Sequence, residues 1–263
     1  MRKIIVIGAG IAGLSSAACL ARGGFDVTVL EKNASAGGRA RKFESQGFVF
    51  DMGPSWYWMP DVFERFFSRF GQRVSDYYEL TRLDPSYRIY YGEHDFTDVP
   101  IGIPGLCEFF EKHERGSSIH LLKFLEEASF KYNLSMGQLV YKPGFTWREL
   151  LNGKIMRGAF KLHIFQSFSQ YVRKFFKNPR LIQLLEFPVL FLGTSPAKTP
   201  ALYSLMNYAD MSLGTWYPMG GMTKIVEAMV EVCGRLRIFS KGDGGIYARL
   251  KTHAMNLGPP FKK

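Results

Sequence analysis

The chain has 263 residues, of which 46% are hydrophobic and 22% charged, the composition of an ordinary globular protein rather than a disordered one. No run of about 18 apolar residues is free of charged ones, so no membrane-spanning helix is predicted. The formal net charge of +11 favours an anionic partner: nucleic acid, a phosphate-rich cofactor or an acidic lipid surface.

The sequence has no pattern typical of a nucleic-acid or metal site. Neither zinc-finger spacing nor a basic heptad region accompanies the positive charge, so we expect no nucleic acid. The three cysteines, Cys19, Cys107 and Cys233, lie far apart, which fits a reducing compartment and gives no metal site. His94 and His120 have no partners at ligand spacing. We therefore expect no metal.

The start of the chain predicts a strand, a glycine-rich turn and a helix. Lys3–Ile7 is apolar without alternation, the pattern of a strand buried on both faces of a parallel sheet. The sequence GAGIAG follows at residues 8–13. Its glycines permit a tight bend, a close approach of pyrophosphate to the backbone, and close packing of helix Ile11–Arg22, whose N-terminus attracts the diphosphate. The same glycines argue against a signal peptide, which basic residues before an apolar stretch otherwise suggest.

A second strand, residues 25–30, ends at an acidic residue. Gly23 and Gly24 end the preceding helix. Glu31 stands at the C-terminal end of the strand, where a carboxylate accepts hydrogen bonds from the adenosine ribose. The same charge would repel the 2′-phosphate of NADP. The unit therefore predicts binding of an ADP moiety, within either FAD or NAD.

The next two motifs distinguish these cofactors. The sequence GGRA at residues 37–40 offers backbone N–H groups and an arginine to a phosphate, although alone it also fits an ordinary loop. GFVFDMGPS follows at residues 47–55. With the glycine turn and Glu31, these motifs resemble the bacterial-type phytoene desaturases, a carotenoid desaturase family of the FAD-dependent amine oxidase superfamily. The resemblance implies FAD, with the diphosphate and ribityl chain near Arg39 and the flavin near residues 51–55.

The resemblance also implies a fold and a set of cofactor-binding residues. The fold is of the α/β class, with an FAD-binding Rossmann-like, doubly wound parallel sheet and an α+β substrate domain. The implied cofactor-binding residues are Gly8, Gly10, Ile11, Ala12, Gly13, Glu31, Lys32, Gly37, Gly38, Arg39, Gly53, Pro54 and Ser55.

Aromatic residues dominate the following segment. Trp56, Tyr57 and Trp58 fit a core cluster and the wall of a substrate site equally well. Pro60 then opens a helix whose apolar side chains recur at helical spacing. Residues 81–100 alternate around a turn near Gly92, which predicts a hairpin. In FAD oxidoreductases of this architecture such strands belong to the substrate domain.

One candidate for acid–base catalysis comes from the resemblance. The sequence TWREL at residues 146–150 matches a family segment in which an acidic residue after an arginine has been considered for this role. Glu149 is therefore the catalytic candidate. An ordinary glutamate at the start of a helix is the alternative.

Residues 153–177 predict an amphipathic helix with a broad aromatic face and a basic face. The pattern favours a core helix whose polar face is solvated, and it also fits a helix on an anionic bilayer surface. The resemblance supports the membrane, since carotenoid substrates are dissolved in it. The expected location is the cytoplasm, with peripheral association at the inner face of the membrane.

The last motif is WYPMGG at residues 216–221, which again resembles the family and is followed by a predicted helix over residues 223–232. In the family this segment lines the junction of flavin and substrate tunnel, which adds Trp216 and Tyr217 to Trp56, Tyr57 and Trp58 as substrate residues. The resemblance runs to about Val232. Residues 234–263 are basic and glycine-rich without periodicity, as a shifted reading frame would produce, and a genuine tail is the alternative.

The predicted organisation has four parts: the N-terminal part of the FAD domain at 1–80, a substrate and membrane-associated domain at 81–213, a return to the FAD domain at 214–232, and an atypical tail at 233–263. Both domains are expected to be incomplete at the C-terminus. The expected function is FAD-dependent introduction of C=C double bonds into phytoene or a related polyene. The alternatives are another flavin amine-oxidase-superfamily enzyme, an inactive fragment, and a non-enzymatic prenyl-binding relative.

Overall fold

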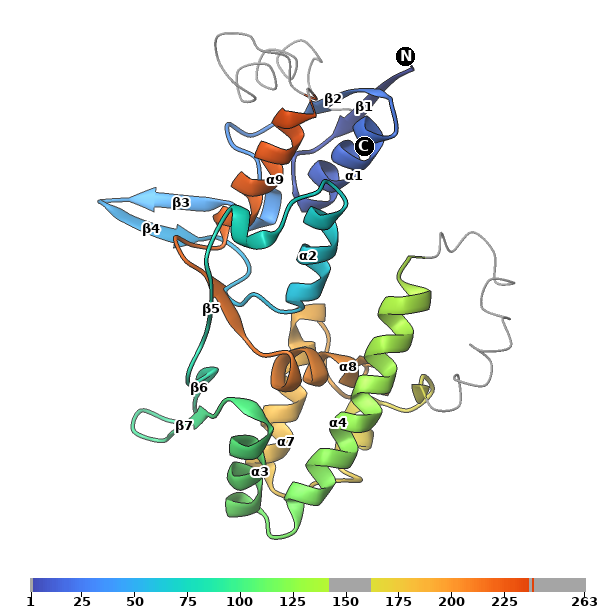
Figure 1. Cartoon of the computed structure of the whole chain (residues 1–263). Helices are drawn as coiled ribbons and strands as arrows, with labels where there is room; N and C mark the ends of the chain where they lie inside the picture. The colour runs from blue at the N-terminus through green and yellow to red at the C-terminus, as the bar shows by residue number, and fades with distance from the viewer. Residues whose placement is uncertain (1, 142–161, 237, 239–263) are drawn as a thin grey trace, which may run out of the picture. The chain divides into compact units, whose positions relative to one another are not determined.

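The chain divides into two compact units in a computed structural model, which describes residues 2–141, 162–236 and 238 (Figure 1). Unit 1 joins Met1–Thr81 to Trp216–Lys263, and unit 2 is the intervening Arg82–Thr215. The predicted changes of domain lie at residues 81 and 214, and the assignment of an FAD domain and a substrate domain stays a prediction.

Unit 1 opens with the predicted α/β arrangement. Strand β1 (Lys3–Ile7) pairs in parallel with β2 (Asp26–Leu30), and helix α1 (Ile11–Arg22) connects them. Parallel strands require such a crossover, and the glycine turn makes it compact. A Cβ atom added at Gly13 would lie 1.9 Å from the carbonyl oxygen of Gly8, so only glycine permits this approach of helix and turn.

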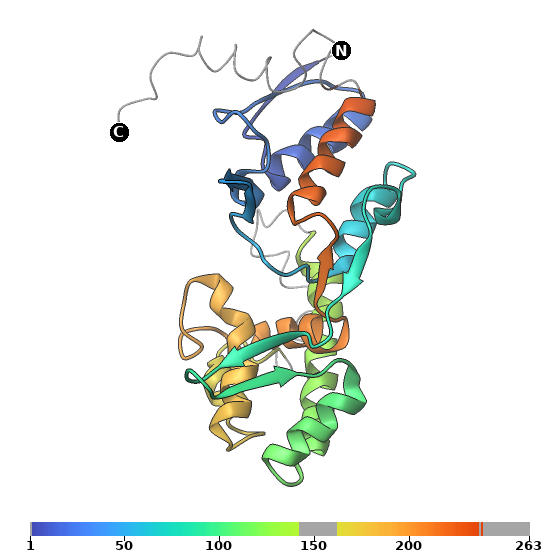
Figure 2. The same cartoon turned by 90° about the vertical axis from the view of Figure 1, so that its left-hand side faces the viewer.

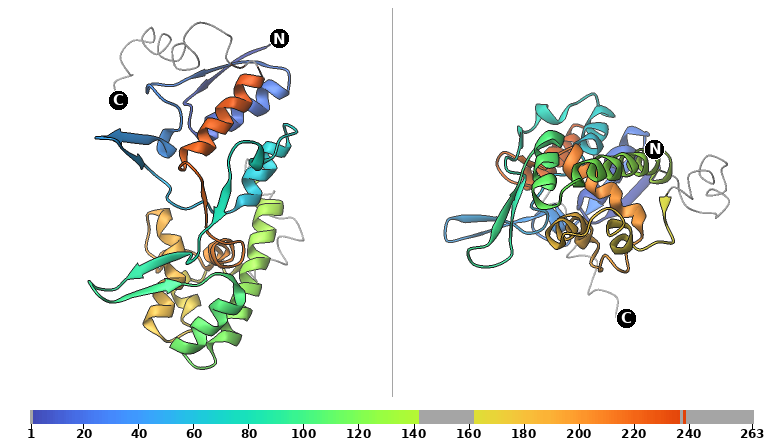
Figure 3. Two further views of the ribbon diagram at one scale, coloured as in Figure 1. Left: turned by 60° about the vertical axis from the view of Figure 1, so that its left-hand side comes forward. Right: turned by 90° about the horizontal axis from the view of Figure 1, so that it is seen from below.

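The remaining elements of unit 1 come from both ends of the chain. Strands β3 and β4 pair antiparallel, and β5 pairs with β8. The left view of Figure 3 shows the β3–β4 hairpin extending away from α1 and α9. The elements are the short turn η1 (Gly38–Ala40), β3 (Lys42–Ser45), β4 (Phe48–Asp51), α2 (Pro60–Ser68), η2 (Val74–Asp76), β5 (Leu80–Arg82), β8 (Trp216–Pro218) and α9 (Thr223–Arg235).

The core of unit 1 lies between α1 and α9, which run side by side in Figures 1 and 2. Helix α1 contributes Leu14, Ala17 and Ala18, all fully buried, and α9 contributes Ile225 and Met229. The small side chains of α1 allow its axis to approach α9 closely. Two segments far apart in sequence therefore share one core.

The prediction that β1 is buried on both faces is wrong for the described part of the chain. Ile5 and Ile7 are 64% and 86% exposed, while Val29 on the neighbouring strand is 2% exposed. The reason is that α1 and α9 cover one side of this two-stranded sheet, and no described element covers Ile5 and Ile7. An apolar run without alternation does not reveal this asymmetry.

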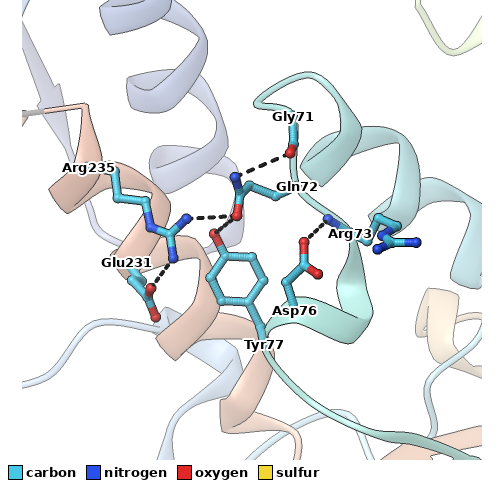
Figure 4. A network of polar contacts seen from close by, with 7 residues as sticks. All are labelled: Gly71, Gln72, Arg73, Asp76, Tyr77, Glu231 and Arg235. Carbon is cyan, nitrogen blue, oxygen red and sulfur yellow. Dashed lines mark hydrogen bonds and ion pairs between the residues drawn. The ribbon is translucent and has the colours of Figure 1, made fainter.

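A polar network fastens the C-terminal end of α9 to the loop after α2 (Figure 4). The guanidinium of Arg235 donates to Gln72 Oε1 at 2.7 Å and to Glu231 Oε1 at 2.6 Å. It also lies 5.5 Å from the centroid of the Tyr77 ring. Helix α9 thus extends to Arg235, beyond the predicted end at Val232, and Cys233 is fully buried. The predicted start of an atypical tail at 233 is therefore too early.

Unit 2 is mainly helical. The predicted hairpin is present as β6 (Tyr87–Tyr90) and β7 (Phe96–Val99), which pair antiparallel, and α3 and α4 lie side by side (Figure 1). Phe110, Phe124, Tyr171 and Phe176 are fully buried and form an aromatic core. The other elements are α3 (Gly102–His113), α4 (Ser117–Leu134), η3 (Ser135–Leu139), α6 (Phe168–Val172), α7 (Pro179–Glu186), η5 (Phe187–Leu192), η6 (Ala201–Ser204), α8 (Leu205–Asn207) and η7 (Tyr208–Ser212).

The continuous helix predicted over residues 153–177 is wrong where the structure describes it, from residue 162 onward. His163 has a left-handed φ of 50°, and Ser167 forms an isolated bridge with Pro200 before it caps α6. Phe168, Tyr171, Val172 and Phe176 are then buried. The described aromatic side chains therefore mostly serve the core of unit 2, the alternative that the pattern favoured. Phe165 is an exception because it is 100% exposed.

None of the helices within 2–141 and 162–236 combines the length and apolar character needed to cross a membrane.

Candidate functional site

A cavity of about 670 Å³ opens at the N-terminus of α1. Four parts of the sequence form its wall: the start of α1, the residues that follow β2, the loop around η1, and Pro54 after β4. The lining residues are Gly10, Ile11, Ala12, Lys32, Asn33, Gly37, Gly38, Arg39, Ala40, Arg41 and Pro54. The structure thus brings most of the predicted cofactor-binding residues to one place.

The N-terminus of α1 has the properties of an anion site. Gly10 is the N-cap residue, it supplies no side-chain acceptor, and the first turn contains no acidic residue. The first N–H groups of a helix have no partner within the helix, and the helix dipole adds positive potential there. This end of α1 therefore suits a phosphate or diphosphate.

Gly37 and Gly38 bring their loop against the turn before α1. The Gly37 N–H donates to the Ala9 carbonyl at 2.8 Å, and a Cβ at Gly38 would lie 3.3 Å from Gly10 Cα. Gly37 has φ of 114°, in the left-handed region that favours glycine. A larger side chain would both strain the backbone and fill the space beside the helix terminus.

Glu31 is only 5% exposed and is bound by the protein itself. Its Oε2 accepts the Ala9 N–H at 2.8 Å, and its Oε1 accepts the Asn33 backbone N–H at 2.9 Å and the Asn33 side-chain amide at 2.6 Å. Burial alone would raise the pKa of Glu31, but these hydrogen bonds, with one from the Lys32 backbone, lower it. The carboxylate is therefore held ionised behind the cavity wall. Each carboxylate oxygen has a second lone pair, so Glu31 can accept a further hydrogen bond from ribose. That bond stays a prediction.

The Gly53–Ser55 segment packs against the loop of Arg39. A Cβ at Gly53 would lie 2.0 Å from the Arg39 carbonyl oxygen, and Met52 donates its N–H to the Arg41 carbonyl at 2.8 Å. Gly53, Pro54 and Ser55 are exposed, and Pro54 lines the cavity. The structure therefore places the second motif beside the first, although Gly53 and Ser55 do not line the cavity themselves.

The predicted substrate residues divide between surface and core. Tyr57 is 1% exposed, and its hydroxyl lies 3.0 Å from that of Tyr78, which is the core position named as the alternative, so contact with a substrate stays a prediction for Tyr57. Burial, then the neighbouring Tyr78, raises the pKa of Tyr57 above the ordinary tyrosine value. Backbone alternation turns Trp56 and Trp58 to the other side, where their rings stack at 5.9 Å and are half-buried.

Trp216 and Tyr217 lie in the same unit as these tryptophans. The Trp216 N–H and carbonyl form both bonds of a bridge with Tyr57, at 3.2 and 2.8 Å. Tyr217 donates its hydroxyl to Asp51 Oδ2 at 2.9 Å. Both aromatic side chains are half-buried. Contact with a substrate stays a prediction for Trp56, Trp58, Trp216 and Tyr217.

Three residues that line the cavity were not among the predicted ones: Asn33, Ala40 and Arg41. Asn33 follows Glu31 by two residues, and an amide beside an acid at a strand end is a signal that was available. Arg41 repeats the arginine of the GGRA motif two positions later, and its Nε donates to the Gly38 carbonyl at 2.8 Å. Glu149, the catalytic candidate, lies outside the described residues.

The donor set fits the diphosphate of a dinucleotide. Lys32, Arg39 and Arg41 supply positive charge, and the α1 terminus and the Gly37–Gly38 backbone supply a surface without side chains. Fixed N–H groups and arginines are the groups that bind phosphates in proteins. Among the described side chains, no group of three His, Cys, Asp or Glu residues is placed to hold a metal ion.

Comparison with known proteins identifies the family of the chain and several of its relatives. The profile of the flavin containing amine oxidoreductase family matches residues 11–243. The chain is 40% identical over 244 residues to a carotenoid 3,4-desaturase of Haloarcula japonica, which covers 92% of this chain and 49% of that protein. It is 32% identical over 262 residues to a 4,4′-diapophytoene desaturase of Staphylococcus aureus, covering 99% of this chain and 51% of that protein.

The chain therefore spans about half the length of the curated relatives it matches. The similarity continues past Val232, so the predicted limit of the resemblance is too early. Among solved structures, a variant of putrescine oxidase superposes with a TM-score of 0.56 at 17% identity, over 89% of this chain and 50% of that one. This likeness supports the fold alone.

Proposed function

The chain belongs to the flavin containing amine oxidoreductase family, and we propose that it acts as an FAD-dependent oxidoreductase. The reaction that we propose is the introduction of C=C double bonds into a carotenoid precursor, phytoene or a related polyene. The observation that carries the proposal is the convergence of the α1 terminus, Lys32 and the Gly37–Arg41 loop on one cavity. The substrate class rests on the relatives, which are named as carotenoid and diapophytoene desaturases.

The described residues have distinct roles in this proposal. The α1 terminus and the glycine loop bind the diphosphate of FAD, while Lys32 and Arg39 neutralise it. Trp56 and Trp58 present stacked aromatic faces that suit an apolar polyene. When bound, the flavin supplies the hydride acceptor that oxidation of a CH–CH bond requires. Glu149 is proposed to receive the accompanying proton.

We further propose that the protein works in the cytoplasm and contacts the anionic inner face of the membrane. The net charge of +11 and the fully exposed Phe165, next to the 37%-exposed Ile164, support this contact. The polyene itself partitions into the bilayer, so a desaturase has to collect it there.

The test starts with cofactor binding. Purified chain is loaded with FAD, desalted, and examined by visible absorption, and the affinities for FAD and NAD are compared by titration. We expect a retained flavin spectrum and tighter binding of FAD. Tighter binding of NAD would contradict the cofactor assignment.

The second stage tests the substrate. The FAD-loaded chain is mixed with phytoene in vesicles, and the absorption of longer conjugated polyenes is recorded together with flavin reduction under anaerobic conditions. Flavin reduction by an amine but not by phytoene would favour another enzyme of the same family. A colourless protein that binds prenyl lipids would favour the non-enzymatic alternative.

A further inference from the structure

Asp51, the last residue of β4, makes contacts that the cofactor motifs do not explain. Its Oδ1 and Oδ2 accept the Met222 N–H at 3.1 and 3.0 Å, and its Oδ2 also accepts the Tyr217 hydroxyl at 2.9 Å. A Cβ added at Gly221 would lie 3.4 Å from Oδ1, so the backbone passes close to the carboxylate. Met222 is the N-cap residue of α9, where a negative charge is favourable.

The backbone of Asp51 is in turn fixed to the cavity wall. Asp51 pairs with Lys42 at the end of the β3–β4 hairpin. The next residue, Met52, donates to the Arg41 carbonyl at 2.8 Å, and Gly53 is packed against the Arg39 carbonyl with no room for a Cβ. Movement of Asp51 therefore requires movement of the loop that lines the cavity.

Helix α9 completes a closed path of contacts. It packs along α1, whose N-terminus lines the same cavity, and its C-terminal end is bound to Gln72 through Arg235 (Figure 4). The path runs from the Arg39 loop through Asp51 to α9, and from α9 through α1 back to the cavity. The carboxylate of Asp51 links the end of β4, which contacts the Arg39 loop, to the start of α9.

We propose that Asp51 is a positioning residue for the flavin site: its carboxylate holds the Trp216–Pro218 strand and the start of α9 in register with the Gly37–Arg41 loop, and FAD affinity depends on this link. The inference rests on the proposed function for the identity of the ligand. The positioning itself concerns the protein without ligand and is tested separately.

The test compares Asp51→Asn with Asp98→Asn as a matched control. Asparagine has nearly the same shape, but it carries no charge and its amide nitrogen replaces one of the two acceptor oxygens, so the hydrogen bonds to the Met222 N–H and the Tyr217 hydroxyl are no longer charge-assisted. Asp98 is also an aspartate on a hairpin with a close partner, Arg88 at 2.6 Å, but it belongs to unit 2. Tyr217→Phe removes one of the Asp51 contacts and gives an intermediate case.

Two measurements are made on each variant. Without FAD, amide hydrogen exchange of Met222 and its neighbours should be faster in Asp51→Asn than in the parent and control. With FAD, the dissociation constant should rise by about tenfold or more, equivalent to one lost hydrogen bond to a charged group, and the visible circular dichroism of bound flavin should change. Tyr217→Phe should show a smaller rise.

Unchanged exchange at Met222 would overturn the inference whether or not the chain binds FAD. Faster exchange with an unchanged FAD affinity, in a chain that binds FAD, would overturn the link to the cofactor. Failure of the parent chain to bind FAD contradicts the proposed function instead, and the exchange result still decides whether Asp51 positions this segment.

Discussion

At the scale of single residues, Glu31 accepts hydrogen bonds from the protein itself and can accept a further one from a ligand. Its carboxylate closes the turn before α1 through the Ala9 N–H and holds Asn33 at the cavity. Because its pKa is lowered in the folded chain, its stabilising contribution is present above the ordinary pKa of a glutamate. That contribution is lost as the pH falls through the lowered folded value.

We predict that Glu31→Gln lowers the free energy of unfolding by about 1.5–3 kcal/mol at neutral pH, because a charged acceptor of buried N–H groups is lost. The measurement is urea unfolding without FAD at several pH values, with the difference from the parent shrinking in acid. Glu44→Gln is the control, since Glu44 forms a largely exposed pair with Lys42. Equal effects of the two substitutions would contradict the prediction.

Lys131 is a second residue whose environment the sequence did not reveal. It is 0% exposed, its Nζ donates to Ser204 Oγ at 3.0 Å, and it lies 3.8 Å from the centroid of the Tyr171 ring. Burial lowers the pKa of Lys131 to about 8, against the opposing effect of Glu127. Between this value and the usual lysine pKa, the unfolded chain binds a proton that the folded chain does not.

The free energy of unfolding of the parent should therefore rise as the pH increases from about 8 towards the usual lysine pKa. Relative to Lys131→Met, the rise over this pH range should be roughly 2–3 kcal/mol. Urea unfolding at pH 7.5, 9 and 10.5 measures this difference directly. Lys123→Met, at an exposed position of the same helix, should leave the pH dependence of the parent unchanged. A parallel pH profile for Lys131→Met and the parent would contradict the assignment.

At the scale of elements, the contact of Gly53 with the Arg39 loop joins two motifs. We predict that Gly53→Ala destabilises the chain by about 1–3 kcal/mol and weakens FAD binding, because the added Cβ would lie 2.0 Å from a backbone oxygen. Gly137→Ala is the control, since no atom lies within 4 Å of its added Cβ. Thermal unfolding and flavin titration of both variants provide the comparison. If Gly53→Ala changed neither the unfolding temperature nor the affinity for FAD, the Arg39 loop would have moved to accommodate the added Cβ, which would contradict the prediction.

A further prediction concerns the turn that carries Phe165. Phe165→Ser should reduce binding to anionic vesicles, because the fully exposed ring is available to enter the interface. Phe191→Ser, at a 62%-exposed position on η5, is the control. Sedimentation with anionic and neutral vesicles at low and high salt measures the effect. Equal loss in both variants, or no preference for anionic vesicles, would contradict the membrane contact.

The elements that the sequence predicted well are those with local signals. The strand, turn and helix of residues 3–22 follow from glycines whose spacing has one physical meaning, and Pro60 marks the start of α2 at the first helical position. The segment near His163 was misjudged because a core helix and a broken segment packed into a core show the same apolar period. The buried state of Tyr57 depends on Tyr78 and Trp216, which its own neighbours in sequence do not indicate.

At the scale of the whole molecule, the second unit is inserted within the first. The Leu83 N–H donates to the Thr215 carbonyl at 3.0 Å, so the two ends of unit 2 lie together. A unit with adjacent ends and its own aromatic core does not need the flanking chain to define its topology.

We therefore predict that residues 82–215 fold when expressed alone, with helical circular dichroism and a cooperative urea transition. Phe124→Ala should destabilise this fragment by about 3–5 kcal/mol, because Phe124 is 0% exposed in its core. The same substitution should shift the corresponding transition of the full chain by a similar amount. A fragment without a cooperative transition would contradict the independence of unit 2.

The packing of α9 on α1 also fixes an order of events during synthesis. Cys233 Sγ lies 3.6 Å from the Leu14 carbonyl oxygen, 219 residues earlier, and a ribosome needs roughly 10–40 s to add that stretch at about 5–20 residues per second. Throughout this interval α1 has left the exit tunnel without the helix that buries Leu14, Ala17 and Ala18. Residues 82–215 of unit 2 are made in the meantime. Helix α1 is thus made long before the helix that covers its apolar face, and we expect the nascent chain to expose this face until α9 is made.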